Sequence, residues 1–352
     1  MSNQFGYCPF LKKIIPVLKL TQTKLFVFLK CFLTTILAIF SIYNTFNKFA
    51  NRLFVIRITA IVYIFLDLLY IGSIVVSELT FEHTLLNIVN HLMTMEEQLP
   101  KRKSASVVML LGASFLSHIV TIGCVISFVL SEGYSNEWDN NVHVAHAINA
   151  NLLKTWAHVK FTTIFFIISK DFEELNKVFY NCSNQKRRNV MHLHMTLSNI
   201  SRQMNTIFSF VLVFSVAFYF VNLIARIIQI YCMYAFGTSR IHNHEAIGLA
   251  VETFRLLVVV WVSKRCMCQA NEIKNVVCKI LINTRNKVQR KEFNAYALQM
   301  FHETLEITAG GCFVIDFTLI FTIITAGSNY VVIILQFLYY DNQYTYRLRL
   351  WN

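Results

Sequence analysis

The chain has 352 residues, of which 55% are hydrophobic and 14% are charged, and it contains 31 phenylalanines. Soluble domains average about 45–50% apolar and about 25% charged residues, so this composition excludes an ordinary soluble protein and indicates a protein of the lipid bilayer. In a soluble chain the net charge of +13 would indicate nucleic-acid binding. In a membrane protein, basic residues gather in the cytoplasmic loops between the spans, and we attribute the charge to these loops.

A helix that spans the bilayer needs about 20 predominantly apolar residues. Seven segments meet this requirement, and they are residues 25–43, 55–77, 105–130, 147–169, 207–235, 247–263 and 311–338. The three prolines all lie outside these segments, so we expect long helices without proline kinks. We therefore predict an all-α membrane protein in which residues 1–352 form a single seven-helix transmembrane domain.

The basic residues predict the orientation of the chain. If the N-terminus is cytoplasmic, the inner segments 1–24, 78–104, 170–206 and 264–307 carry 21 of the 32 lysines and arginines, whereas the outer segments carry five. Cytoplasmic loops of membrane proteins hold an excess of these residues. The bias predicts a cytoplasmic N-terminus and an extracellular C-terminus.

Helical spacing of apolar residues continues beyond the spans into the inner segments. In residues 264–307 it is carried by Ile273, Val277 and Ile280. We expect residues 266–310 to form cytoplasmic anchor helices. The adjacent glycines Gly310 and Gly311 predict a break between these helices and the last span.

The last span ends in the sequence Asn329-Tyr330-Val331-Val332-Ile333-Ile334-Leu335-Gln336-Phe337. A glutamine amide within a span needs a polar partner or water, because lipid offers neither. Helical projection predicts one face made of Thr322, Ala326, Asn329, Tyr330, Ile333, Gln336, Phe337 and Tyr340. Either the amides bond to a neighbouring helix, or this face lines a polar path through the membrane.

This nonapeptide resembles the C-terminal signature of the insect gustatory receptors, which reads Thr-Tyr, five hydrophobic residues and Gln-Phe. Asn329 stands where the family usually has threonine. The stretch from Thr308-Ala309-Gly310 into a helix bearing Asp316 also resembles the family's pattern. The resemblance covers residues 291–337, and upstream it rests on the layout of seven spans.

The resemblance implies a tastant-gated, non-selective cation channel in the plasma membrane of sensory neurons. Its expected partners are a small-molecule tastant, membrane lipid and other gustatory receptor subunits in a homo- or hetero-tetramer. In the family the last helix lines the pore. Residues 311–340 are therefore expected to form the pore-lining helix, in which Ile333, Gln336 and Phe337 form the gate and Tyr330 supports it.

The family places its ligand pocket in the outer half of the bundle of the first six spans, here residues 1–265. The aromatic and polar candidates for this pocket are Tyr63, Trp156, Tyr219, Asn222, Tyr231 and Tyr234. Sugar receptors of the family commonly carry glutamate at the position of Val331, so the resemblance favours bitter or plant-derived compounds. A sugar-responsive gustatory receptor and an insect odorant receptor subunit are the alternatives.

Other classes fit the sequence poorly. A G-protein-coupled receptor has its N-terminus outside, prolines in its helices and an acidic-Arg-Tyr triplet. This sequence predicts a cytoplasmic N-terminus, has no proline in its predicted spans and lacks the triplet. We expect no enzyme and no cofactor, because the sequence has no Gly-x-Ser-x-Gly element or paired catalytic acids. We also expect no metal site, since histidines two residues apart, such as His192 and His194, do not share a helix face.

Several ionisable residues lie within the predicted spans. Arg255 lies near a span end, from which it is expected to reach the interface. Asp67 and Asp316 lie deeper, with Arg226 or Lys160 as possible partners.

Overall fold

The computed structural model describes Ile36, Ile39 and residues 54–96, 137–181, 184–235, 242–283 and 287–350. Almost all of this part is helical. Its elements are α3 (Phe54–Glu96), α5 (Glu137–Asn181), α6 (Asn184–Ala235), α7 (His242–Asn283), α8 (Lys287–His302), β1 (Thr308–Ala309), β2 (Phe313–Val314) and α9 (Phe317–Leu350). The predicted spans at 25–43, apart from two isoleucines, and at 105–130 lie outside the described residues.

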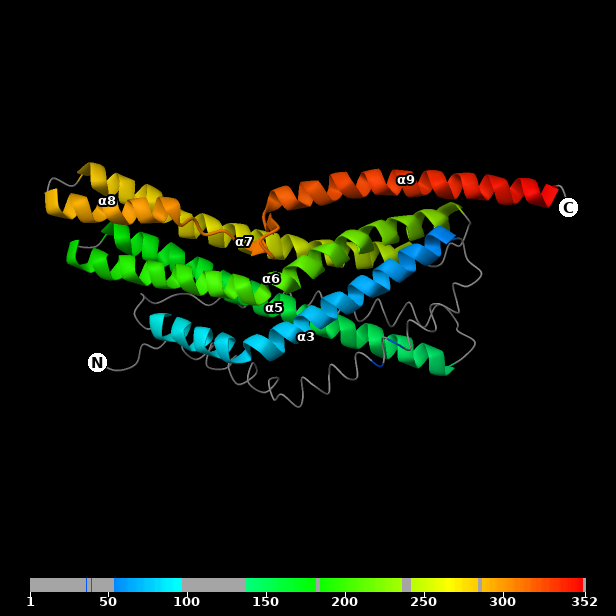
Figure 1. Cartoon of the computed structure of the whole chain (residues 1–352), viewed down its shortest axis with the longest axis horizontal. Coiled ribbons are helices and arrows are strands. Elements are labelled where there is room, and N and C mark those ends of the chain that lie inside the picture. Colours follow the sequence, from blue (N-terminus) through cyan, green and yellow to red (C-terminus); the bar gives the residue numbers. More distant parts are fainter. Residues whose placement is uncertain are drawn as a thin grey trace.

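Four of the described helices, α3, α6, α7 and α9, are long and apolar enough to cross a membrane. Helices α5, α6 and α7 have 45, 52 and 42 residues. At about 1.5 Å per residue they are roughly 63–78 Å long, about twice the thickness of the hydrocarbon core. This length confirms that the helices continue well beyond the spans. Their extensions lie with α8 at one end of the molecule, and the chain's C-terminus lies at the other (Figure 1).

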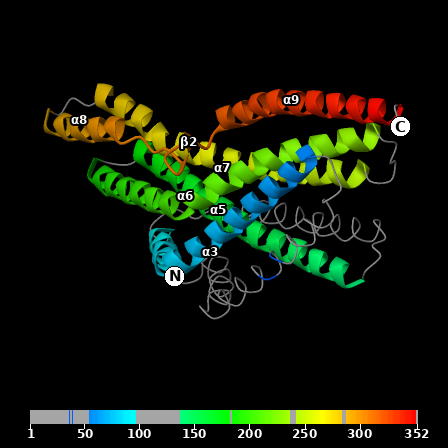
Figure 2. The same ribbon diagram turned by 45° about the vertical axis from the view of Figure 1, so that its right-hand side comes forward.

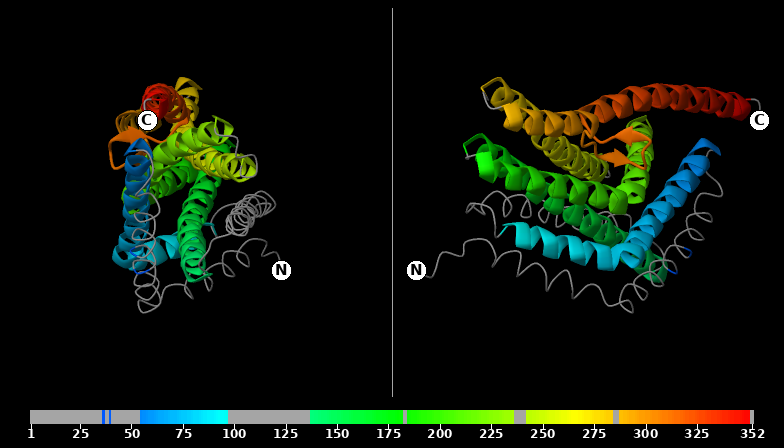
Figure 3. Two further views of the ribbon diagram at one scale, coloured as in Figure 1. Left: turned by 90° about the vertical axis from the view of Figure 1, so that its right-hand side faces the viewer. Right: turned by 60° about the vertical axis from the view of Figure 1, so that its left-hand side comes forward.

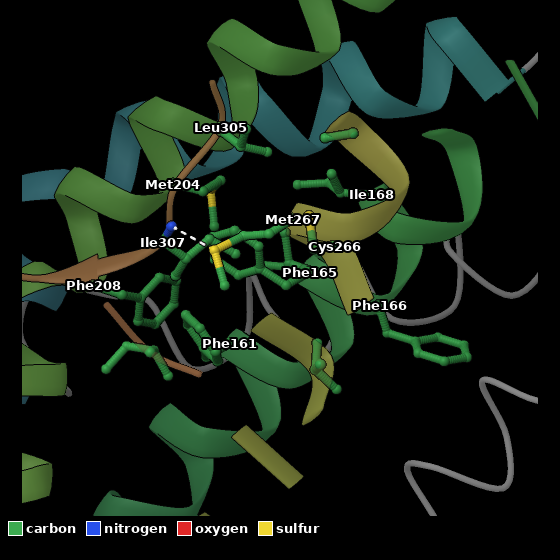
Figure 4. Packing of buried hydrophobic residues seen from close by; sticks show 14 of the residues in the cluster. Phe161, Phe165, Phe166, Ile168, Met204, Phe208, Cys266, Met267, Leu305 and Ile307 are labelled. Atoms are coloured by element: carbon green, nitrogen blue, oxygen red, sulfur yellow. Dashed lines mark hydrogen bonds between the residues drawn. The ribbon is translucent and has the colours of Figure 1, made fainter. Parts of the chain in front are cut away.

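The extensions pack around α5. Its residues Phe165, Ile168, Phe172, Leu175 and Phe179 alternate in spacings of three and four, and none has exposed surface. This spacing is the heptad pattern that brings one seam of a helix against its neighbours. The α5 helix makes its most extensive contacts with α7. The same core continues into α6, α7 and the segment after α8, where Met204, Met267 and Leu305 meet the phenylalanines of α5 (Figure 4).

Charged residues inside the bundle form ion pairs, and the expectation that Arg255 reaches the interface was wrong. Asp67 binds Lys154 on α5, and Lys160 binds Glu78 at 2.6 Å. Arg255 is only 6% exposed and binds Glu252 at 2.8 Å. The helices pack so closely here that these charges bind partners within the bundle instead of extending to the interface.

A short β-hairpin separates α8 from α9 (Figure 2). Thr308 pairs with Val314 and Ala309 with Phe313. Gly310 and Gly311 have φ angles of 60° and 71°, a left-handed conformation that glycine adopts without steric cost. The predicted break at the two glycines is confirmed, and it moves the start of the last helix from Gly311 to Phe317.

Candidate pore helix and ligand pocket

The α9 helix begins at a well-formed cap. The carboxylate of Asp316 accepts hydrogen bonds from the backbone N–H of Thr318 at 3.0 Å and from its hydroxyl at 2.5 Å, as an N-cap residue does. These bonds, led by the one from the hydroxyl, lower the pKa of Asp316. Lys264 lies 3.7 Å away. Asp316 thus stands at the start of the helix, and its expected position deep in a span was wrong.

One face of α9 packs on α6. Leu319, Ile323, Gly327 and Val331 follow one another at intervals of four residues, and all are buried. At Gly327 a Cβ would lie 3.4 Å from Leu223 of α6, so the two helices approach closely there. Apart from this line of contact, α9 lies on the outside of the described part of the chain (Figure 3).

The rest of the α9 surface divides into two exposed faces. One is apolar and contains Phe317, Phe321, Ile324, Val332 and Tyr339, which are 41–70% exposed. The other is polar, and we call it the polar face: it contains Thr318, Thr322, Thr325, Asn329 and Gln336, all of them exposed. At 3.6 residues per turn the polar face lies about 150° from the line of contact with α6.

The predicted gate residues lie on or beside the polar face. Ile333 is 47% exposed, Phe337 is 62% exposed, and Gln336 is exposed between them. The ring of Tyr330 packs edge-on against Phe220 of α6, with centroids 5.9 Å apart. Tyr330 therefore contacts the helix bundle through its ring, although its side chain is 53% exposed.

The sequence-based projection missed Thr318 and Thr325. Their spacing from Thr322, four and three residues, marks the same helix face, so the signal was present in the sequence. The hydroxyl of Thr322 donates to the carbonyl of Thr318 at 3.0 Å. Such a local bond satisfies a threonine hydroxyl without water, so the groups of the polar face that need an external partner are the amides of Asn329 and Gln336.

The hairpin and the residues just before it form hydrogen bonds with polar side chains of α6 and α7. Asn205 of α6 accepts from the N–H of Thr308 at 3.1 Å and donates to its hydroxyl at 3.3 Å. Asn271 of α7 makes a similar pair of bonds to the backbone of Leu305, at 3.0 and 3.2 Å. The N–H of Gly310 donates to Ser209 at 2.8 Å. These contacts fix the start of α9 relative to the bundle.

The residues predicted for the ligand pocket are distributed over α3, α5 and α6. Tyr63 on α3 packs on Phe218, with centroids 5.2 Å apart. The hydroxyl of Tyr219 lies 3.0 Å from that of Thr253 on α7. Asn222 is 3% exposed and accepts a bond from Arg226 at 3.0 Å. Trp156 lies on α5 and Tyr231 is 39% exposed, while the side chain of Tyr234 lies outside the described part.

A polar cluster that the sequence did not reveal connects α3, α5 and α6. The hydroxyl of Tyr70 on α3 lies 2.7 Å from Nε2 of His158 on α5, and Ser215 of α6 lies 3.5 Å from the same nitrogen. His158 also lines a cavity of about 20 Å³ between α5 and α7. A second cavity, of about 30 Å³, lies between α3, α5 and α6 beside the Lys160–Glu78 pair.

Residues 5–341 match the model of the 7tm chemosensory receptor family. The chain belongs to this family. Part of the receptor is 30% identical over 82 residues to the putative gustatory receptor 28b of Drosophila melanogaster, a match that covers 23% of this chain and 17% of the fly protein. The resemblance to insect chemoreceptors noted in the sequence is thereby confirmed.

The receptor also has the fold of a solved insect olfactory receptor. It is similar to OR5 from Machilis hrabei in complex with eugenol, with a TM-score of 0.73 and 13% identity over 93% of this chain and 98% of OR5. A second OR5 structure gives a TM-score of 0.64 and 12% identity over 89% of each chain. At this identity the likeness shows the fold, and it confirms the predicted all-α membrane class.

Proposed function

We propose that this chemosensory receptor is a ligand-gated, non-selective cation channel whose pore is lined by the polar face of α9. The observation that carries the proposal is the arrangement of α9, which turns its polar residues directly away from its own bundle. Lipid does not satisfy the amides of Asn329 and Gln336. Copies of the receptor that surround a common axis would place these groups in water.

The gate in this proposal is the outer part of the polar face. Ile333 and Phe337 are large, apolar and exposed, and rings of such residues close a narrow pore by excluding water. Gln336 offers an uncharged amide to passing ions. The polar face carries no acidic or basic side chain between Thr318 and Gln336, which favours weak selectivity among cations.

The receptor is proposed to assemble as a homo- or hetero-tetramer in the plasma membrane of sensory neurons, with a cytoplasmic N-terminus and residues 266–310 as the anchor. Its ligand is proposed to be a bitter or plant-derived compound that binds in the outer half of the bundle. The similar receptor OR5 binds eugenol, a small molecule, in its solved complex, which supports a small-molecule ligand here. A sugar-responsive receptor and an odorant receptor subunit are the alternatives, and ligand screening separates the three.

The test uses two isoleucines of α9 that are similarly exposed, Ile333 at 47% and Ile324 at 58%, but lie on different faces. In whole-cell recordings Ile333→Ala is expected to raise the current measured without ligand, because a smaller side chain lets water enter the gate. Ile324→Ala, on the apolar face, is expected to leave this current unchanged. Gln336→Ala is expected to change conductance or ion selectivity more than ligand sensitivity.

Equal effects of the two isoleucine variants would refute the assignment of the faces. A ligand response that disappears when G-protein signalling is blocked would refute the channel itself. A C-terminal epitope that antibodies reach only after permeabilisation would refute the orientation.

A further inference from the structure

His194 lies at a junction of four helices, in the part of α6 that precedes the predicted span 207–235. Its side chain is 1% exposed. The centroid of its ring lies 4.9 Å from that of Phe172 on α5 and 6.5 Å from that of Tyr296 on α8. Its Nε2 lies 3.1 Å from the backbone carbonyl oxygen of Ala270 on α7. One imidazole therefore contacts the three helices that pack around α6 at this point.

The bond to Ala270 defines which ring nitrogen carries hydrogen. A carbonyl oxygen only accepts, so Nε2 donates and Nδ1 of the neutral ring is left as an acceptor. Nδ1 is buried and has no hydrogen-bond partner among the described residues. A proton added to Nδ1 would create a buried donor without an acceptor on a charged ring, and both are unfavourable. The closed junction therefore accommodates the neutral ring alone.

Few titratable groups surround His194 on the helices that pack against it. They are Tyr296 on α8, Cys266 and Lys274 on α7, each one turn from the bonded carbonyl, and Asp171 on α5. Burial raises the pKa of the Tyr296 phenol and, with the charge of Asp171, that of the Cys266 thiol. Burial lowers the pKa of His194 from 6.5 to about 4, and the bond to the backbone carbonyl offsets only part of this. The ring is thus neutral at the pH of a resting cytoplasm because it is buried.

The helix that His194 binds also holds the segment leading to α9. Asn271 follows the bonded carbonyl in the chain and forms hydrogen bonds with the backbone of Leu305 at 3.0 and 3.2 Å. The N–H of Ile307 donates to Sδ of Met267 at 3.2 Å (Figure 4). Leu305 and Ile307 lead directly into the hairpin that precedes α9. A displacement of α7 at this junction therefore displaces the start of α9.

We infer that His194 is an acid-sensitive latch, which holds α6, α7 and α8 together while it is neutral and opens the junction when acidification of the cytoplasm protonates it. Opening separates α9 from the bundle that positions it, so ligand-evoked current falls. Only this effect on the current rests on the proposed function.

The size of the effect follows from the difference in proton affinity between the two states. In the open junction water reaches the ring and its pKa returns to 6.5, whereas in the closed junction it is about 4. The closed junction is therefore fully stable above pH 6.5 and is progressively disfavoured as the pH falls towards 4. The equilibrium constant for opening is expected to rise about threefold between about pH 7.2 and about pH 6.0, and about ninefold by about pH 5.5.

The test measures amide hydrogen exchange in α7 and α8 of the purified full-length receptor over this pH range, with rates corrected for the intrinsic effect of pH. The wild type is expected to show the predicted rise in opening. His194→Gln retains an N–H donor for the carbonyl but takes up no proton, so its opening should not depend on pH; His194→Asn is the second variant of this kind. His192→Gln is the matched control, because it removes an exposed histidine from the same helix and should behave like the wild type.

Wild-type opening that does not rise on acidification would overturn the inference, whatever the variants do. The same rise in the two His194 variants, or its loss in His192→Gln, would also overturn it. In inside-out patches, acid on the cytoplasmic face is expected to reduce ligand-evoked current in the wild type more than in His194→Gln. Acid-sensitive opening without any ligand-evoked current would support the latch and refute the channel, whereas a current equally acid-sensitive in both proteins would refute the link from the latch to α9.

Discussion

The two glycines of the hairpin offer a comparison that isolates one contact. Gly310 and Gly311 share a left-handed conformation, with φ angles of 60° and 71°. A Cβ on Gly310 would lie 2.9 Å from Cγ2 of Val213 on α6, whereas a Cβ on Gly311 would meet nothing within 4 Å. Substitution by alanine therefore strains the backbone at both positions but adds a clash at only one.

The left-handed conformation costs a residue with a side chain about 1–2 kcal/mol, which is the destabilisation expected for Gly311→Ala. Overpacking in a well-packed region adds about 1–3 kcal/mol, so Gly310→Ala is expected to cost about 2–5 kcal/mol. The measurement is the melting temperature of the purified receptor in detergent, together with its surface expression. Gly310→Ala should lower both more than Gly311→Ala does.

A second substitution tests the cause. Val213→Ala removes the methyl group that the new Cβ would meet, so Gly310→Ala combined with Val213→Ala should be less destabilised than the sum of the two single variants. Equal melting temperatures for the two glycine variants, or strictly additive effects in the double variant, would refute the close approach of the hairpin to α6.

Three further predictions follow from charged groups. Lys154→Met is expected to destabilise the receptor by about 3–5 kcal/mol, because it removes the counter-charge that Lys154 gives the buried carboxylate of Asp67; adding Asp67→Leu should recover part of the loss, and a double variant no more stable than Lys154→Met would contradict this pairing. Hydrogen bonds from Lys170 and then Lys177 lower the pKa of Glu173 from 4.5 to about 2. The stability from this group is present above pH 4.5 and lost as the pH falls towards 2, so Glu173→Gln should flatten the acid limb of a melting-temperature profile, and an unaltered profile would exclude the interaction. Asp316→Ala should cost about 0.5–2 kcal/mol through loss of the cap and speed hydrogen exchange in the first turn of α9; unchanged exchange there would mean that the cap is not formed.

Local helix patterns could be predicted from the sequence, whereas the partners of the buried charged residues could not. Periodicity predicted the described apolar helices and their continuation beyond the spans, because an apolar helix face is a local property of the chain. The sequence could not assign a partner to Asp67, since a pairing between helices depends on their rotation and register, and Lys154 lies 87 positions away. The break at Gly310 was foreseen, but the shift of the helix start to Phe317 depended on the hairpin contacts with α6.

The sequence by itself determined the membrane class, the membership of the chemoreceptor family suggested by its last helix, and the polar nature of one face of that helix. These features follow from composition and from spacing along a single helix. Only the tertiary structure decided that the polar face turns away from α6, that Tyr330 turns towards it, and that His194 is buried at the junction of α5, α6, α7 and α8. Each of these depends on which helix lies against which, and that is set by the packing of side chains distant in the sequence.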